Sequence, residues 1–190
     1  TLLPPTSGRI LCDGKDIFKM DGEYRNLLGY LPQEFGFYPD FTVKDYLLYI
    51  ASLKGIQPMV ADKRVKELLA QVGFTKSANN KRRKLSGGMK RRAGSAQAML
   101  NNPKILILDE PSTYVDANFE NEFYSVLGEL NKTMSIVMVS HDLGTICSYV
   151  KTIACVNGGL HYHESNLITP EQLKLYNCPI ELISHGTVPH

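Results

Sequence analysis

A continuous apolar run that ends in two acids limits the fold of this chain more than any other feature of its sequence. Ile105 to Leu108 contains no polar residue, a pattern typical of a strand buried on both faces of a parallel sheet. Asp109 and Glu110 would then stand at the carboxyl end of that strand, the edge where α/β proteins bind ligands. The alternative is an ordinary strand end whose acids only cap the following turn.

The rest of the chain predicts an α/β fold, because short apolar segments alternate with helical patterns. We expect strands at residues 9–12, 27–31, 105–108, 136–139, 153–156 and 160–163, the last two joined across the turn at 157–159. We expect helices at residues 43–55, 60–72, 119–130, 143–149 and 169–176. Residues 34–99 show helical patterns and little strand, so they are predicted to form a helical insertion in the sheet domain.

Composition restricts the class of protein. The chain has 190 residues, the size of one domain with or without a subdomain. Its 21 Lys and Arg against 19 Asp and Glu argue against a basic or acidic partner surface over the whole chain. The four cysteines form no CxxC pair, so reduced cytosolic thiols are expected instead of disulfides or a zinc ribbon. No apolar run is long enough to cross a bilayer, and no signal peptide is visible.

A glycine pair after a serine marks a second candidate site. Leu85-Ser86-Gly87-Gly88-Met89 opens a helical stretch. Backbone N–H groups at the positive end of such a helix suit an anion such as phosphate. A plain glycine loop between two helices is the alternative.

Three single polar residues follow the predicted strands or the acidic pair. Gln33 comes just after the strand at 27–31, and His141 just after the strand at 136–139. Asp116 lies in the short loop after Glu110. An imidazole at this edge of a sheet can hydrogen-bond a terminal phosphate or a water. Taken alone, a Gln or His in such a position is more often structural.

The order and spacing of these motifs resemble the ATP-binding cassette (ABC) family, specifically the nucleotide-binding subunit of a transporter. LSGGMKRR followed by ILILDEPS carries the resemblance, which covers nearly the whole chain. It implies a P-loop NTPase (RecA-like) parallel sheet core with an inserted ABC helical subdomain. The core would comprise residues 1–33 and 100–165 with its N-terminal part missing, the helical subdomain residues 34–99, and a C-terminal tail residues 166–190.

The resemblance implies a role for each residue around the nucleotide. Asp109 closes the Walker B strand and holds Mg²⁺, and Glu110 is the general base that acts on the attacking water. Gln33 is the Q-loop glutamine, near Mg²⁺ and the membrane subunit. His141 is the switch histidine that steadies the charge of the transition state.

The resemblance also implies partners. Ser86, Gly87 and Gly88 would donate to the γ-phosphate of ATP held by a second ATPase subunit in a head-to-tail dimer, and Asp116 belongs to the D-loop. The segment from Gln33 to Leu53 would pass the motion of the dimer to the membrane subunits. The protein is therefore expected at the cytoplasmic face of the cell membrane, as a peripheral subunit.

One motif of the family is missing. The phosphate loop has the form GxxxxGK[ST], whereas Gly14-Lys15 is followed by Asp16 and has no glycine five places earlier. We expect this Walker A loop to lie before Thr1, which is not a Met, so that the chain is a fragment. The isolated chain is then expected to bind ATP poorly and to hydrolyse almost none, because the phosphates lack their backbone cradle and Lys.

The two halves resemble different transporters. Residues 30–38 and 89–92 look like drug, antibiotic or ABC-2-type exporters. From Ser112 onward the chain looks like zinc and manganese importers, in STYVDANFE, VSHDLGTICSYVKTIACVN and CPIELISHGTVPH. The tail lies outside the shared ATPase chemistry, so we favour metal import and keep an exporter, or a mosaic of two sequences, as the alternative.

Other patterns have alternative interpretations. His161 and His163 share one face of a predicted strand and could bind zinc, although a solvated edge strand is the simpler explanation. The basic residues at 81–84 and 90–92 could bind nucleic acid, as in non-transport ABC ATPases, or form a solvated face beside a phosphate site. No aromatic residues are interleaved with them, which disfavours nucleic acid as a partner. A degenerate ABC fragment is disfavoured because Asp109, Glu110 and His141 are intact.

Overall fold

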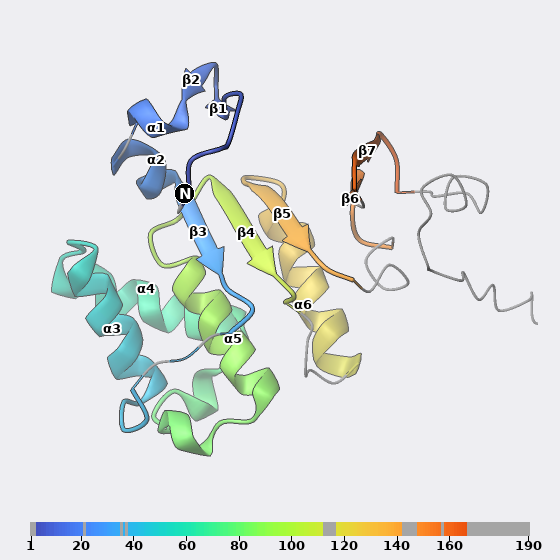
Figure 1. Cartoon of the computed structure of the whole chain (residues 1–190). Coiled ribbons are helices and arrows are strands. Elements are labelled where there is room, and N and C mark those ends of the chain that lie inside the picture. The colour runs from blue at the N-terminus through green and yellow to red at the C-terminus, as the bar shows by residue number, and fades with distance from the viewer. Residues whose placement is uncertain are drawn as a thin grey trace, which may run out of the picture. The chain divides into compact units, whose positions relative to one another are not determined.

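A computed structural model of the chain describes residues 3–20, 22–34, 36, 38–111, 117–141, 148–156 and 158–166, without the side chains of 117–119. The chain divides into two compact units, Thr1–Val139 and Ser140–His190. Figure 1 shows the helices and the parallel strands, all of which belong to the first unit. Each unit is considered by itself below.

The centre of the first unit is a three-stranded parallel sheet with the order β3-β4-β5. The strands are β3 (Leu28–Leu31), β4 (Ile105–Asp109) and β5 (Ser135–Val139). Leu31 pairs with Leu108, which in turn pairs with Met138, so the three strands end at the same edge (Figure 1). The predicted strands at 27–31, 105–108 and 136–139 and the parallel sheet are confirmed.

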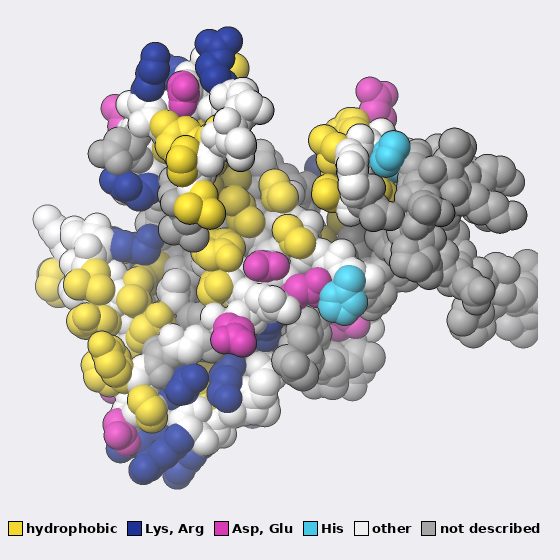
Figure 2. All heavy atoms as spheres, in the orientation of Figure 1, with side chains coloured by type: hydrophobic (Ala, Val, Ile, Leu, Met, Phe, Trp, Pro, Cys, Tyr) yellow, Lys and Arg dark blue, Asp and Glu magenta, His cyan; other side chains and the backbone are white. Residues whose placement is uncertain are grey.

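The two faces of this sheet differ in burial. Leu31, Leu106 and Leu108 are almost fully buried against the helices. On the other face Tyr30 is 43% and Val137 is 50% exposed, and Figure 2 shows hydrophobic side chains at the surface over these strands. The expectation that the strand at 105–108 is buried on both faces is therefore wrong for the part of the chain described. Among the residues described, helices α3 to α6 share a core with the Leu31, Leu106 and Leu108 face of the sheet, while the alternate residues of β4 stay half-buried.

Between β3 and β4 lie α3 (Val43–Leu53), α4 (Pro58–Gln71) and α5 (Gly87–Ala98), with 3-10 turns at Thr75–Ser77 and Arg82–Lys84. Thr42 caps α3 by accepting a 3.1 Å hydrogen bond from the N–H of Asp45. Their inward faces share one apolar core, to which α3 contributes Leu47 and α4 contributes Leu68, both fully buried. The helices predicted at 43–55 and 60–72 are confirmed, while the subdomain boundaries at 33/34 and 99/100 stay predictions.

The start of the chain differs from expectation. The strand predicted at 9–12 is only β1 (Leu11–Cys12), paired with β2 (Lys15–Asp16) around a tight turn at Asp13-Gly14. Both turn residues have positive φ, 49° and 76°, which glycine adopts easily. Two short helices follow, α1 (Ile17–Met20) and α2 (Gly22–Leu27). They are too short to produce the apolar period that predicts a helix.

The remaining elements are α6 and a hairpin. Helix α6 (Ala117–Leu130) includes the predicted 119–130 helix and supplies Phe123 and Leu127 to the core of the first unit. In the second unit, β6 (Ile153–Val156) and β7 (Leu160–His163) form the predicted antiparallel hairpin. The predicted helix at 169–176 and most of that at 143–149 lie outside the described residues. No described helix has the length and apolar character needed to span a membrane.

Candidate functional site

The carboxyl ends of β3 and β4 bring three predicted site residues to one edge of the sheet. Gln33 stands two residues beyond Leu31 and is exposed. Asp109 ends β4 and Glu110 follows it, and both are half-buried. Figure 2 shows acidic side chains at the surface over these strand ends. The edge thus offers carboxylate and amide oxygens to a ligand approaching from solvent.

The backbone at Glu110 has an unusual conformation. Its φ is +48°, in the left-handed region that side-chain-bearing residues rarely adopt. Its N–H donates a 2.9 Å hydrogen bond to the carbonyl oxygen of Val139, the last residue of β5. Such a conformation costs about 1–2 kcal/mol and is found often at functional sites. The strand β4 therefore ends abruptly, and the backbone of the second acid is held by the neighbouring strand.

The glycine pair forms the start of α5, as predicted. Ser86 is the N-cap, with extended backbone, and its hydroxyl oxygen accepts a 3.3 Å hydrogen bond from the N–H of Met89. Gly87 is exposed and Gly88 half-buried. The first N–H groups of a helix have no acceptor within the helix, so this end can bind an anion. It borders a cavity of about 150 Å³ whose lining includes Phe74, Ser86 and Arg92.

The basic residues around α5 do not form one solvated face. Lys81 and Arg83 lie 3.5 and 3.8 Å from a carboxylate oxygen of Asp40 on the surface. Arg91, in contrast, is only 4% exposed, and its Nη1 donates a 2.7 Å hydrogen bond to the carbonyl oxygen of Pro32. The prediction of a solvated face is therefore wrong for this residue. Its burial depends on the contact with Pro32, 59 positions away in the sequence, so no local pattern could have predicted it.

The described residues do not test the predicted positions of His141 and Asp116 at this edge. His141 is exposed and belongs to the second unit. Asp116 lies outside the described residues. In Gly14-Lys15, the single Gly-Lys pair of the sequence, Gly14 ends the turn of the β1–β2 hairpin and Lys15 begins β2.

The two histidines of the β6–β7 hairpin differ in exposure. His163 is 7% exposed and pairs with Ile153, whereas His161 is exposed and pairs with Cys155. Among the residues described, no group of three or more His, Cys, Asp or Glu is arranged to hold a metal ion. The described residues therefore do not support a zinc site on this strand.

Comparison with known proteins identifies a family. The ABC transporter family model matches residues 1–113. Over 152 residues the chain is 38% identical to the uncharacterized ABC transporter ATP-binding protein YxlF of Bacillus subtilis, covering 78% of this chain and 50% of that protein. Over 179 residues it is 35% identical to a probable metal transport system ATP-binding protein of Thermotoga maritima, covering 90% and 74%. Further relatives are named for linearmycin resistance, methionine import and molybdate or tungstate import.

The fold agrees with these matches. The dimeric structure of a bacterial ABC transporter cassette superposes with a TM-score of 0.70 at 26% identity, covering 80% of this chain and 70% of that one. The chain spans about half the length of the Bacillus relative and about three quarters of the Thermotoga relative.

Proposed function

The chain belongs to the ABC transporter family of ATP-binding proteins, and on that premise we propose that it is the nucleotide-binding part of a transporter that uses ATP hydrolysis to drive transport. The observation that carries the proposal is the common sheet edge of Gln33, Asp109 and Glu110, together with the capped N-terminus of α5. Oxygen ligands and free backbone N–H groups are what a nucleotide with its metal ion requires.

We assign Asp109 and Gln33 to Mg²⁺, because half-buried carboxylate and exposed amide oxygens at one edge are the hard ligands that this ion prefers. Bound Mg²⁺ would neutralise charge on the phosphates. Glu110 is proposed as the general base that orients or deprotonates the attacking water, with its backbone held by Val139. His141 is proposed to steady the charge that develops in the transition state.

The second half of the nucleotide site is proposed to come from a second copy. Ser86, Gly87 and Gly88 would donate to the γ-phosphate of ATP held by the partner subunit, and Asp116 would lie at the same interface. The exposed glycine at the helix start supports this, because its N–H group is open to a ligand of another chain.

Membrane subunits are the other proposed partner. Tyr38, Phe41 and Tyr49 form an aromatic cluster within the segment predicted to reach the membrane subunits. The ring of Phe41 lies 5.4 Å from that of Tyr38 and 5.9 Å from that of Tyr49, measured between centroids. Tyr38 is 63% exposed, and Figure 2 shows hydrophobic side chains gathered at the surface over α3. Exposed aromatic side chains of this kind favour a protein contact. We propose that this cluster meets the membrane subunits at the cytoplasmic face of the membrane.

For the transported substrate we propose a metal ion, of the zinc or manganese class. The name of the Thermotoga relative, which covers 90% of this chain, supports metal transport. An exporter ATPase is the second candidate, which the linearmycin-resistance relative at 35% identity supports. The two candidates are distinguished by the uptake of radioactive zinc and manganese into cells with and without the gene. Metal import predicts lower uptake without the gene, whereas an exporter of another substrate predicts no difference.

The function is tested by ATP binding and hydrolysis with Mg²⁺, on this chain and on the longest natural protein that contains it. We expect the longer protein to be active. This chain by itself is expected to bind ATP weakly, because Gly14-Lys15 belongs to a short β-hairpin and does not form a phosphate loop. Normal turnover by the 190-residue chain would contradict that expectation, and inactivity of both would contradict the proposed function.

A further inference from the structure

A buried arginine connects the helix that begins at the glycine pair to the segment that carries Gln33. Arg91 lies in the middle of α5 and is 4% exposed. Its Nη1 donates to the carbonyl oxygen of Pro32 at 2.7 Å, across 59 positions of sequence. A buried cation is costly unless it is hydrogen-bonded. This hydrogen bond therefore holds the Arg91 guanidinium and the Pro32 carbonyl in place relative to each other.

Pro32 is well suited to link the position of α5 to that of Gln33. Proline has no N–H, so its carbonyl is the one backbone group it can offer to a hydrogen bond. The peptide that follows is planar and contains both this carbonyl and the N–H of Gln33. Holding the carbonyl therefore fixes the direction in which the chain enters Gln33.

A second contact holds the same strand to the same helix. A Cβ atom on Gly29 of β3 would lie 2.2 Å from the carbonyl oxygen of Ala98, the last residue of α5. Helix α5 is thus in close contact with β3 near Ala98. About two helical turns away, at Arg91, it is hydrogen-bonded to Pro32, the residue that follows β3. Ser86 lies only about 7–8 Å further along the helix axis from Arg91. Two separated contacts resist rotation of the helix relative to the strand.

We propose that Arg91 is a positioning residue that joins the Gln33 segment to the N-terminus of α5, so that displacement of one displaces the other. Nucleotide that contacts Gln33 of one subunit would in this way alter the position of the Ser86 end that faces the partner's nucleotide. This inference rests on the proposed function for its consequence, but the mechanical link itself can be tested without ATP.

The first test is the mobility of the Gln33 segment in Arg91→Met, which keeps an apolar stem of similar length but removes the guanidinium. The ¹⁵N order parameter of the Gln33 amide is expected to fall from about 0.85 to below about 0.6, while that of Ala93 within α5 is unchanged. In Arg91→Lys, which keeps a donor, the order parameter of the Gln33 amide should lie between those of the natural protein and of Arg91→Met. An order parameter for Gln33 that is the same in all three proteins overturns the proposal, whether or not the protein hydrolyses ATP.

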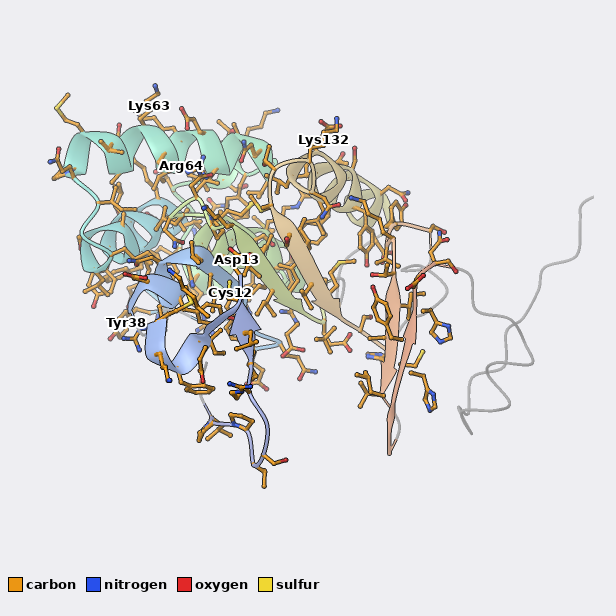
Figure 3. The ribbon with its side chains drawn as sticks, turned by 90° about the horizontal axis from the view of Figure 1, so that it is seen from above. Cys12, Asp13, Tyr38, Lys63, Arg64 and Lys132 are labelled. Carbon is orange, nitrogen blue, oxygen red and sulfur yellow. The ribbon has the colours of Figure 1, made fainter. Side chains whose placement is uncertain are left out.

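Arg64 provides a matched control. It donates to the carbonyl oxygen of Met99 at 3.0 Å, so it is also an arginine that holds a backbone carbonyl, but at the other end of α5. Figure 3 shows Arg64 pointing toward the body of the first unit while its neighbour Lys63 points away. Arg64→Met should leave the Gln33 amide unchanged, and an equal loss of order there would show general loosening and overturn the proposal.

The second test is a double-mutant cycle in the longest natural form of the protein. Arg91→Met should lower kcat about ten- to a hundredfold, the effect of losing one charge-assisted hydrogen bond. If Arg91 acts through Gln33, Arg91→Met combined with Gln33→Ala should be no slower than Gln33→Ala alone. The effects of Arg64→Met and Gln33→Ala on kcat should instead be independent, so that their fold-changes multiply in the double variant. Independent effects of Arg91→Met and Gln33→Ala on kcat would overturn the link, whereas no turnover in the unmutated protein would overturn the proposed function instead.

Discussion

The N–H of Glu110 donates a 2.9 Å hydrogen bond to the carbonyl oxygen of Val139. The bond continues the pairing of Asp109 with Val139 by one residue, although Glu110 has already left strand geometry with a φ of +48°. The second acid of the motif is therefore held by the strand that precedes His141 in the chain. Rarely adopted backbone conformations are frequent at functional sites, so this one supports the proposed role of Glu110.

Glu110→Gln tests the proposed base. The amide keeps the size of the side chain but cannot accept a proton, so kcat for ATP hydrolysis should fall about 10²- to 10⁴-fold while ATP binding remains. The measurement is phosphate release and nucleotide affinity in the longest natural protein. Glu129→Gln is the control, because Glu129 lies exposed near the end of α6 and pairs with Lys132. Equal activity of the Glu110→Gln and Glu129→Gln proteins would contradict the assignment.

Two substitutions of Ser86 distinguish its role as helix cap from its proposed contact with nucleotide. Ser86→Ala should lower the free energy of unfolding by about 1 kcal/mol, because the N–H of Met89 loses its acceptor. Ser86→Asp should keep the cap and the stability, since Asp is an equally good N-cap. Its negative charge would, however, repel the γ-phosphate of the partner's ATP. ATP-dependent dimerisation, measured by gel filtration, should be lost in Ser86→Asp, and a normal dimer would contradict the proposed role.

Gly29 is required where β3 meets α5. A methyl group there would lie 2.2 Å from the carbonyl oxygen of Ala98, so Gly29→Ala should lower the free energy of unfolding by about 1–3 kcal/mol or more. Gly128→Ala is the matched control, because Gly128 lies within α6 and has no neighbour within 4 Å of its added Cβ. It should raise the free energy of unfolding by about 0.5–1 kcal/mol through helix propensity. Urea denaturation of both variants measures these changes.

Tyr49 tests contact with the membrane subunits. It is 41% exposed and packs edge-on against Phe41. Tyr49→Ser should weaken co-purification with the membrane subunits severalfold, because an exposed aromatic side chain in such a contact contributes about 1 kcal/mol or more. Tyr149→Ser is the control, since Tyr149 is 45% exposed and lies in the second unit. Equal loss of co-purification in both variants would contradict a specific contact at the aromatic cluster.

Asp62 links stability to pH. Hydrogen bonds from Lys66 and Lys44 hold the pKa of its carboxyl below the ordinary value. Because the pKa is lowered in the folded state, the stabilisation is present above the pKa of the unfolded chain and is lost as the pH falls through the folded value. Asp62→Asn should therefore be less stable than the natural chain at pH 7 and equally stable in strong acid, as judged by thermal unfolding. High salt should also reduce the difference at pH 7, because exposed pairs are screened.

Several features could be predicted from short stretches of residues. The apolar runs of β3, β4 and β5 predict strands, and their alternation with helical patterns predicts a parallel sheet. Ser86 before two glycines predicts the start of α5 for a similarly local reason. The family follows from the order of these motifs, which the matches to known proteins confirm.

Other features depend on residues far apart in the chain. The short helices α1 and α2 escape prediction because they have no complete apolar period. Which face of β4 is covered depends on where the helices pack, so the apolar run alone overstates its burial. The subdomain boundaries and the roles of all the predicted site residues remain predictions.

The sequence by itself therefore determined the strands of the sheet, the capped helix and the family, because each depends on a pattern that spans a few neighbouring residues. Only the tertiary structure decided that Arg91 is buried and bonded to Pro32, and that the N–H of Glu110 reaches Val139. Both contacts join segments that are distant in sequence. Their formation depends on how helix and strands pack, and no local periodicity encodes that arrangement.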